Sequence, residues 1–216
     1  MIQIHTISIG RPQTLTDGRG NWRSAIRRTP VSGPITLGPR GLEGDRVADT
    51  KHHGSPDQAV CCHSLDHYAR WNEVYGLADP AAQLQPGNIG ENWTLTGATE
   101  ADICIGDIYA AGSARVQVTG TRYPCYKQER ATGLADLHNR AMQEMRTGFY
   151  LRVLTPGTVQ AGDELVLEAR PHPGVTLAAL NACEFGELDP ATARAFLDVP
   201  ELTEGWKNIL RKRLGE

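Results

Sequence analysis

One cysteine in this sequence lies among residues that could make its thiol reactive. Cys125 stands between Arg122 and Lys127, in the segment 122–127 that follows a predicted strand and precedes a predicted helix. Loops held by such rigid elements often carry functional side chains. Nearby cations stabilise a thiolate, which is the better nucleophile and the form of cysteine that binds soft metals. The pattern indicates either a reactive or metal-binding thiol, or a cysteine that only packs in its loop.

Two groups of histidines are further candidates. The segment 51–54 reads Lys-His-His-Gly, and a loop with these side-chain and backbone donors could bind an anion or a substrate. A polar turn between strands is the alternative interpretation. His63 and His67 are four residues apart, which would place two imidazoles on one helical face for a divalent metal. Because His63 precedes the expected helix cap at Ser64, the sequence does not favour this metal site.

The other four cysteines are predicted to pack in the interior. Cys61 and Cys62 are adjacent in a predicted strand, so their side chains point to opposite faces and cannot bind one ion together. Cys104 lies in an apolar run that we expect to be a strand, and Cys183 lies in a helical tail. Phosphate-binding glycine loops, a Gly-x-Ser-x-Gly elbow and a His-Glu-x-x-His motif are absent from the sequence. Their absence argues against the nucleotide-binding and hydrolase classes that depend on them.

Short apolar runs predict the strands that would position these side chains. Residues 2–9 alternate between apolar and polar, which is the period of a half-buried strand. Gly-Asp turns at 106–107 and 162–163 each precede an apolar run and predict two more strands. Further strands are expected at Val47, 59–62, 93–96 and 114–119. Many short strands separated by turns indicate a mainly β fold, either a barrel or a sandwich.

Helices are expected at two places within this strand-rich part and at three places in the tail. Ser64 can cap a helix that ends at Gly76, and a second helix is expected over 134–145. Beyond residue 175, three short helical patterns follow, the last two beginning at Asp189 and Thr203.

Prolines and a glycine in the segment 170–174 resist a continuing strand and mark a boundary. We therefore predict a β-barrel domain over residues 1–172 and a small C-terminal helical appendage over residues 173–216. The amphipathic pattern of the tail predicts that this appendage packs on the barrel.

Composition and charge narrow the classes of function. The chain has 216 residues, enough to bury a core, with 40% hydrophobic and 22% charged residues. Its net charge of -3 argues against a surface built to neutralise nucleic-acid phosphates. No segment approaches the roughly 20 apolar residues of a membrane span. Five cysteines without a Cys-x-x-Cys pair, and no secretory pattern in residues 1–10, favour a reducing, cytoplasmic compartment.

A set of short motifs runs along nearly the whole chain. They are Ser24-Ala25-Ile26, Pro30-Val31, Gly41 to Asp45, His53-Gly54, Ala59-Val60, Pro86 to Asn92, Ile105 to Asp107, Arg122 to Lys127, Thr147 to Leu154 and Pro156-Gly157. In this order and combination they resemble the MOSC domain family, and most of all its YiiM-like branch. Two positions depart from the family's usual pattern: Ser55 replaces a second glycine, and Ile89 stands where an aromatic residue is often found.

The resemblance implies a MOSC-type β-barrel core with inserted short helices that holds the molybdenum cofactor, a molybdopterin whose metal takes one sulfur from a protein cysteine. Cys125 matches that position. For the members that are enzymes, it implies two-electron reduction of N-hydroxylated compounds, with hydroxylaminopurines as the substrates associated with the YiiM-like branch. A cofactor carrier or sulfur-transfer module without its own turnover is the alternative. A metal-free hydrolase that pairs Cys125 with His53 is another.

The resemblance also implies roles for matching residues. Arg28 and Arg122 would anchor the terminal phosphate of the pterin, because a guanidinium fork suits phosphate and keeps its charge. His53 would donate a proton to the leaving oxygen, since its ordinary pKa of roughly 6.5 suits that work. Further hydrogen bonds to the cofactor are expected from Ser24, Asn92 and Lys127.

Electrons would come from a separate donor. Reduction of an N–O bond consumes two electrons, yet the sequence has no iron–sulfur spacing and no dinucleotide fingerprint. We therefore expect a flavoprotein reductase as the partner and a small N-hydroxylated molecule as the substrate. Neither nucleic acid nor a membrane is expected to be a partner. The basic run at 211–213 is interpreted as complementing the dipole of the last helix.

Overall fold

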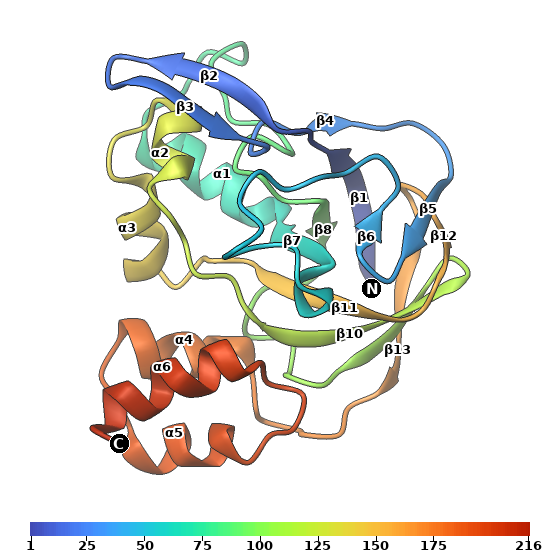
Figure 1. The fold of residues 1–216 in the computed structure, drawn as a ribbon, viewed down its shortest axis with the longest axis vertical. Coiled ribbons are helices and arrows are strands. Elements are labelled where there is room, and N and C mark those ends of the chain that lie inside the picture. Colours follow the sequence, from blue (N-terminus) through green and yellow to red (C-terminus); the bar gives the residue numbers. More distant parts are fainter.

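Seven strands close into a barrel in the computed structural model, which describes residues 1–216 (Figure 1). Their order around the barrel is β13 (Glu164–Ala169), β9 (Ile108–Ala111), β10 (Ala114–Thr121), β11 (Phe149–Thr155), β7 (Val60–Ser64), β8 (Trp93–Thr96) and β1 (Ile2–Ile9). Pairing of Ile2 in β1 with Leu165 in β13 closes the ring. All neighbours are antiparallel except β7 and β8. The mainly β fold predicted from the sequence is confirmed, as a barrel.

Strand β1 buries two isoleucines that a regular strand would place on opposite faces. Ile4 and Ile7 are both buried, although residues three apart in a regular strand point to opposite faces. The register between β1 and β8 shifts between Ile4 and Thr6. An irregularity of this kind turns the strand, so both isoleucines reach the core.

Six further strands and one short helical turn lie outside the ring. Strand β4 (Thr29–Pro30) pairs with the end of β1, while β5 (Ile35–Gly38), β6 (Gly41–Leu42) and β12 (Gly157–Val159) form a small sheet. Strands β2 (Gln13–Asp17) and β3 (Gly20–Ser24) form a hairpin, and η1 (Pro56–Gln58) is a single turn.

Three helices before the tail lie beside the barrel, and the first and third of them share a second, smaller core. They are α1 (Leu65–Val74), α2 (Lys127–Thr132) and α3 (Leu137–Gln143). The predicted cap of α1 is confirmed, since the Ser64 hydroxyl accepts the Asp66 amide at 3.3 Å. Tyr68 and Trp71 of α1 pack with Leu137 of α3 in the second core.

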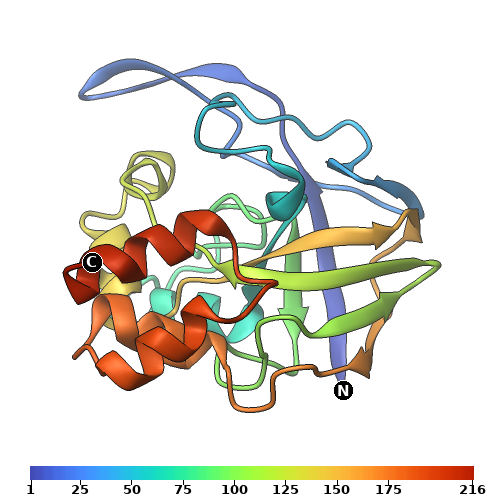
Figure 2. The same ribbon diagram turned by 60° about the horizontal axis from the view of Figure 1, so that its bottom comes forward.

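Ion pairing joins the β2–β3 hairpin to α2. Arg130 donates to both carboxylate oxygens of Asp17, at 2.6 and 2.8 Å, and its guanidinium lies 4.7 Å from the centre of the Trp22 ring. These contacts hold the chain that leads into Ser24 against the helix that follows Cys125, and Figure 1 shows β3 beside α2. Figure 2 shows the hairpin, in blue, extending over the top of the molecule.

Three expectations for secondary structure are corrected. Val47 lies in a loop without a strand, because an isolated apolar residue next to the left-handed Gly44 has no ladder to join. Cys104 makes only an isolated bridge with Thr176. The helix expected over 134–145 is limited to α3, because Asp136 has a φ of 64° that is incompatible with a continuous helix.

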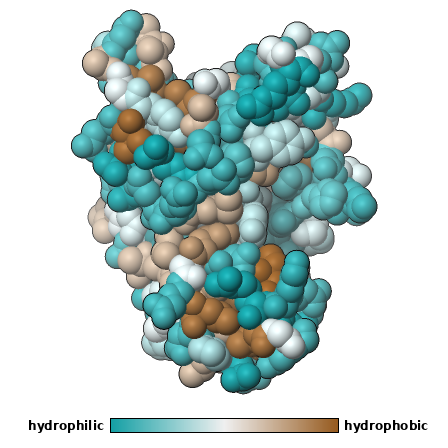
Figure 3. Space-filling model, turned by 90° about the vertical axis from the view of Figure 1, so that its left-hand side faces the viewer, coloured by the Kyte–Doolittle hydropathy of each residue, from teal (hydrophilic) through white to brown (hydrophobic).

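The tail forms α4 (Leu177–Phe185), α5 (Pro190–Leu197) and α6 (Glu204–Leu214) beneath the barrel in Figure 1. Leu180, Phe196 and Trp206 belong to the same hydrophobic cluster as the barrel strands, so the predicted packing of the tail on the barrel is confirmed. Figure 3 shows hydrophobic side chains, in brown, among hydrophilic ones on this lower part of one face. None of the helices combines the length and the apolar character that crossing a membrane would require.

Candidate functional site

A cavity of about 680 Å³ lies where four segments of the chain meet. These segments are the end of β3 with the residues after it, the long loop that leads into β7, the turn before β8, and the segment between β10 and α2. The structure brings all of the predicted site residues to this cavity: Ser24, Arg28, His53, Asn92, Arg122, Cys125 and Lys127. They come from distant parts of the sequence, so their convergence is a property of the fold.

Cys125 lies in the cavity wall between β10 and α2. It is the one cysteine that is partly exposed, whereas the other four are buried. All five thiols are free. The chain therefore presents a single partly exposed sulfur, and it does so in a cavity lined by both cationic and apolar side chains.

Arg122 supplies a buried positive charge next to this sulfur. The residue is 7% exposed, its backbone N–H donates to the Gly148 carbonyl at 2.9 Å, and its Nη2 donates to the Ile89 carbonyl at 2.8 Å. Its Nη1 is buried without any hydrogen-bond partner. A buried guanidinium with an unused donor is unfavourable unless a ligand accepts from it. An anion in the cavity would satisfy that donor.

Arg28 is held by Asp45, a residue to which the sequence reasoning assigned no role. The Arg28 guanidinium pairs with the Asp45 carboxylate and its Nε donates to the Gly90 carbonyl at 3.0 Å. Asp45 also accepts the Gly10 amide at 2.7 Å. The only sequence signal for Asp45 was its place at the end of the Gly41 to Asp45 motif.

Asn92 connects this ion pair to the barrel. Its side-chain N–H donates to Asp45 at 3.1 Å and to the Ser8 carbonyl at 3.3 Å. Its side-chain oxygen accepts the Cys61 amide at 3.1 Å. Because protein groups already engage both ends of this amide, Asn92 is built to hold the loop in place as well as to line the cavity.

The remaining predicted residues keep polar atoms near the cavity. The Ser24 hydroxyl accepts the Ile26 amide at 3.2 Å. His53 is half-buried, and burial together with the nearby charge of Arg122 lowers the pKa of its imidazole. The ring is therefore neutral at neutral pH. Lys127 is half-buried at the first position of α2.

Two tight glycines shape the wall. Gly90 has a φ of +85°, and a Cβ built there would lie 2.6 Å from Ile26 Cγ1 and 3.5 Å from Arg122 Nη2. Gly54, next to His53, has a φ of +83°, and a Cβ there would lie 2.9 Å from Val47 Cγ2. Side chains at these positions would displace the residues that line the cavity.

The cavity is rich in positive charge although the chain as a whole is acidic. Five arginine and lysine residues line it against two aspartates, while the net charge of the chain is -3. The cations are Arg28, Arg40, Arg46, Arg122 and Lys127. Such a local excess attracts an anionic ligand.

Other lining residues were not predicted as part of the site. Tyr150 and Cys61 lie in the wall, and burial raises the pKa of each. Both are therefore neutral, and Cys61 is only 4% exposed, in line with the packing role expected for it.

The histidine pair lies outside this cavity. His63 is 1% exposed and its ring centre is 4.8 Å from that of His67. His67 bonds to Glu100 at 2.8 Å, and no group of three metal-binding side chains is present in the structure. His67 thus belongs to a buried hydrogen-bond network, whereas both ring nitrogens of His63 are buried without a partner.

The fold and the cavity define a β-barrel protein with a cation-lined site and one accessible thiol, suited to an anionic cofactor. The MOSC domain model matches residues 49–166 of this chain. The chain belongs to the MOSC domain family and to its YiiM-like branch. MOSC domains are generally associated with binding of the molybdenum cofactor.

Relatives match over almost the full length. The uncharacterized protein YflK of Bacillus subtilis is 34% identical over 209 residues, which cover 96% of this chain and 92% of that protein. Protein YiiM of Escherichia coli is 30% identical, with coverage of 94% and 89%. A protein of Gibberella moniliformis named reductase is 32% identical over 71% of this chain, but only 27% of that protein is covered.

A solved structure has the same fold. The crystal structure of YiiM from Geobacillus stearothermophilus superimposes with a TM-score of 0.82 at 34% identity, covering 99% of this chain and all of that one. The superimposed region therefore includes both the barrel and the C-terminal helices.

Proposed function

We propose that this chain binds the molybdenum cofactor in the cavity, with Cys125 as the protein sulfur ligand, and reduces N-hydroxylated compounds of the hydroxylaminopurine type. The observation that carries the proposal is the convergence of the seven predicted residues on one cavity with a single accessible thiol. The family relationship supports a molybdenum-dependent oxidoreductase, and the reductase-named relative agrees with it.

The residues present fit this cofactor. The pterin ends in a phosphate, and the unpartnered Nη1 of Arg122 is a buried donor for such an anion. The Arg28 guanidinium also lines the cavity, and its bonds to Asp45 and Gly90 fix its orientation. Cys125 provides a soft sulfur ligand, which suits a metal that binds thiolate.

When bound, the cofactor supplies the two electrons that break the N–O bond of the substrate. The protein's part is to bind, to orient and to deliver protons. His53 is the cavity-lining histidine, and its neutral ring can donate one N–H while accepting a proton from solvent at the other nitrogen. We assign His53 the transfer of protons to the oxygen that leaves as water.

A separate protein would return the electrons. The sequence has no iron–sulfur spacing and no dinucleotide fingerprint, which supports a donor outside this chain. We propose a flavoprotein reductase as the donor.

The decisive test compares Cys125→Ser with the matched control Cys104→Ala, a buried cysteine outside the cavity. Both proteins would be purified from cells that make the cofactor, and bound molybdenum would be measured together with reduction of a hydroxylaminopurine by reduced viologen. We expect Cys125→Ser to lose turnover and most of its molybdenum, because serine is a harder ligand and is almost wholly protonated at neutral pH. The control should keep both.

Other outcomes would change the conclusion. Molybdenum bound by the unaltered chain without any turnover would favour the carrier or sulfur-transfer alternative. Near-normal molybdenum content and turnover in Cys125→Ser would refute the assignment of the ligand.

A further inference from the structure

Two helices of the C-terminal appendage form hydrogen bonds with the last residue of the strand that leads to Cys125. Thr121 ends β10, is fully buried and directly precedes Arg122. Its carbonyl accepts the indole N–H of Trp206 in α6 at 2.7 Å. Its hydroxyl lies 2.8 Å from the side-chain oxygen of Asn181 in α4 and 2.6 Å from the Thr147 hydroxyl. Two tail helices therefore bond to the same residue at the edge of the cavity.

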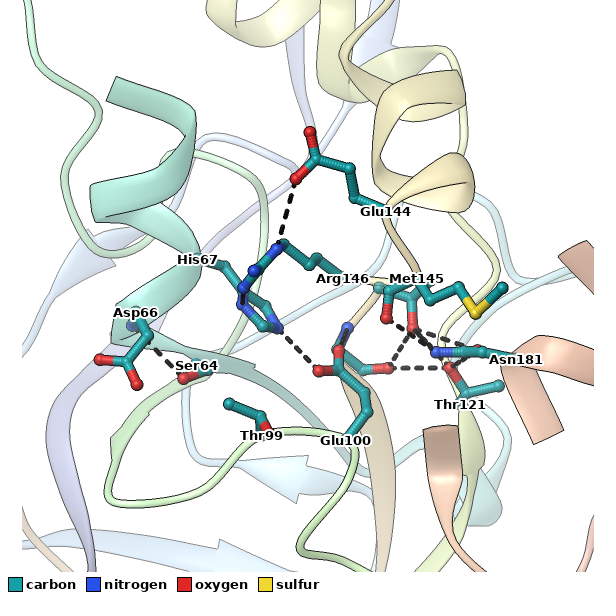
Figure 4. Close-up of polar contacts among 12 residues, drawn as sticks. Ser64, Asp66, His67, Thr99, Glu100, Thr121, Glu144, Met145, Arg146 and Asn181 are labelled. Carbon is teal, nitrogen blue, oxygen red and sulfur yellow. Dashed lines mark hydrogen bonds and ion pairs between the residues drawn. The ribbon is translucent and has the colours of Figure 1, made fainter. Parts of the chain in front are cut away.

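Asn181 also forms hydrogen bonds with the neighbouring segment 145–147, as Figure 4 shows. Its side-chain N–H donates to the Met145 carbonyl at 3.1 Å and to the Thr147 hydroxyl at 3.0 Å. Asn181 is fully buried, and every polar atom of its side chain is used. Buried polar networks that are fully satisfied fix one arrangement of the chain.

Residues before and after Thr121 also contact the tail helices. A Cβ at Gly120 would lie 2.7 Å from Trp206 Cδ1, so the indole packs directly on the strand backbone. The Tyr123 hydroxyl donates to Glu184 at 3.2 Å, and its ring centre is 5.2 Å from that of Phe185. Because successive residues of an extended chain point in opposite directions, side chains 121 and 123 reach the tail while Arg122 faces the cavity.

The other side of Arg122 is anchored in a second buried network. Its amide donates to the Gly148 carbonyl, and the Gly148 amide donates to Glu100 at 2.7 Å. Glu100 in turn bonds to His67, whose other ring nitrogen accepts from Arg146 at 3.2 Å (Figure 4). Arg122 is thus held between the barrel network and the tail.

We propose that Asn181 and Trp206 are positioning residues that fix the segment from Arg122 to Cys125 in the cavity wall by holding Thr121. This inference rests on the proposed function, because the purpose of the positioning is to keep the phosphate-binding guanidinium and the thiol in fixed relative positions. The tail helices themselves contribute no residue to the cavity wall. They act on the site through β10.

The first test is local hydrogen exchange in the chain without cofactor. Trp206→Phe keeps an aromatic ring and removes the bond to Thr121, and Trp93→Phe is its control, because the Trp93 indole is fully buried and its N–H has no partner. We expect exchange of the backbone amides of residues 122–127 other than Pro124 to be about fivefold or more faster in Trp206→Phe, the effect of losing one buried hydrogen bond, and unchanged in Trp93→Phe. Equal rates in the two variants would overturn the proposal.

The second test separates positioning from general packing by rescue. Thr121→Val removes the hydroxyl at nearly constant volume, whereas Thr121→Ser keeps it. Protein loaded with cofactor should release molybdenum several-fold faster on dilution in Thr121→Val, and Thr121→Ser should restore retention. Equal release by the two variants would overturn the role of the hydroxyl.

The two proposals fail in different ways. If Cys125→Ser retained its molybdenum, the proposed function would fail while the exchange result could still stand. If these amides exchanged normally in Trp206→Phe, the positioning role would fail while the cofactor site could still stand.

Discussion

Replacement of Asp45 by asparagine tests whether the cavity wall is organised as described. The change keeps the size of the side chain and removes its charge. In the native protein this carboxylate pairs with Arg28 and accepts from the Gly10 amide and the Asn92 side chain. An asparagine oxygen in the place of Oδ1 would keep the bonds from Gly10 and Arg28, but the NH₂ group would then face the donor of Asn92. In the reverse orientation the NH₂ group would face the donors of Gly10 and Arg28.

The expected loss follows from the burial of the pair. The side chains of Arg28 and Asp45 are 9% and 11% exposed, so little solvent screens them. Removing one partner of a buried ion pair costs about 3–5 kcal/mol, and a hydrogen bond to a charged group is worth about 1.5–3 kcal/mol. Because the pair borders an open cavity where water can partly hydrate Arg28, we expect Asp45→Asn to lower the free energy of unfolding by about 2–4 kcal/mol.

Urea denaturation at pH 7 would measure this loss, with Glu43→Gln as the matched control. Glu43 is exposed in the same segment and makes no ion pair, so its change should stay within about 0.5 kcal/mol. Inorganic phosphate should stabilise Asp45→Asn more than the native chain, since Arg28 is released for an anion. A loss below about 1 kcal/mol, or equal stabilisation by phosphate in both proteins, would refute this account of the wall.

Three further outcomes are expected. Trp206→Ala should lower the melting temperature, because truncation of a buried tryptophan costs about 3–5 kcal/mol; an unchanged curve would mean that α6 is loosely attached. Burial raises the pKa of Glu100, but hydrogen bonds from His67 and Gly148 outweigh the effect of burial and leave the pKa below its usual 4.5. Glu100 therefore stabilises the fold above about pH 4.5, and this contribution is lost as the pH falls. Glu100→Gln should accordingly be less stable than the native chain at pH 7, with a gap that narrows in acid, and a gap independent of pH would contradict this. The purified protein with NADH or NADPH alone should not reduce a hydroxylamine, whereas an added flavoprotein reductase should restore turnover; steady turnover without it would reveal a second cofactor.

The parts of the site that lie close together in sequence could be predicted from it. Arg122, Cys125 and Lys127 share one short loop, so their proximity needs no knowledge of the fold. Asp45 could not be assigned a role in this way. It meets Arg28 and Asn92 across separations of 17 and 47 residues, so these contacts form only in the folded chain. Tyr150 joins the cavity from β11 for the same reason.

The predictions of secondary structure also succeeded where the cause lies within a few residues and failed where it lies elsewhere in the fold. The caps Ser64, Asp189 and Thr203 were predicted because a capping side chain bonds within its own helical turn. The strand expected at Val47 was wrong because a strand needs a partner at its edge, which a single apolar residue does not reveal. The left-handed Asp136 that delays α3 is set by its surroundings, and no local residue pattern marks it.

Net charge and the local distribution of charge bear on different kinds of partner. A net charge of -3 argues against nucleic acid because long-range attraction depends on the whole surface. A cofactor phosphate meets only the few groups that touch it. Of the two predicted anchors, Asp45 neutralises Arg28, whereas Arg122 has no acidic partner and keeps one buried donor unused. Arg122 therefore carries the uncompensated charge that an anion would neutralise, and Arg28 serves first to fix the wall around it.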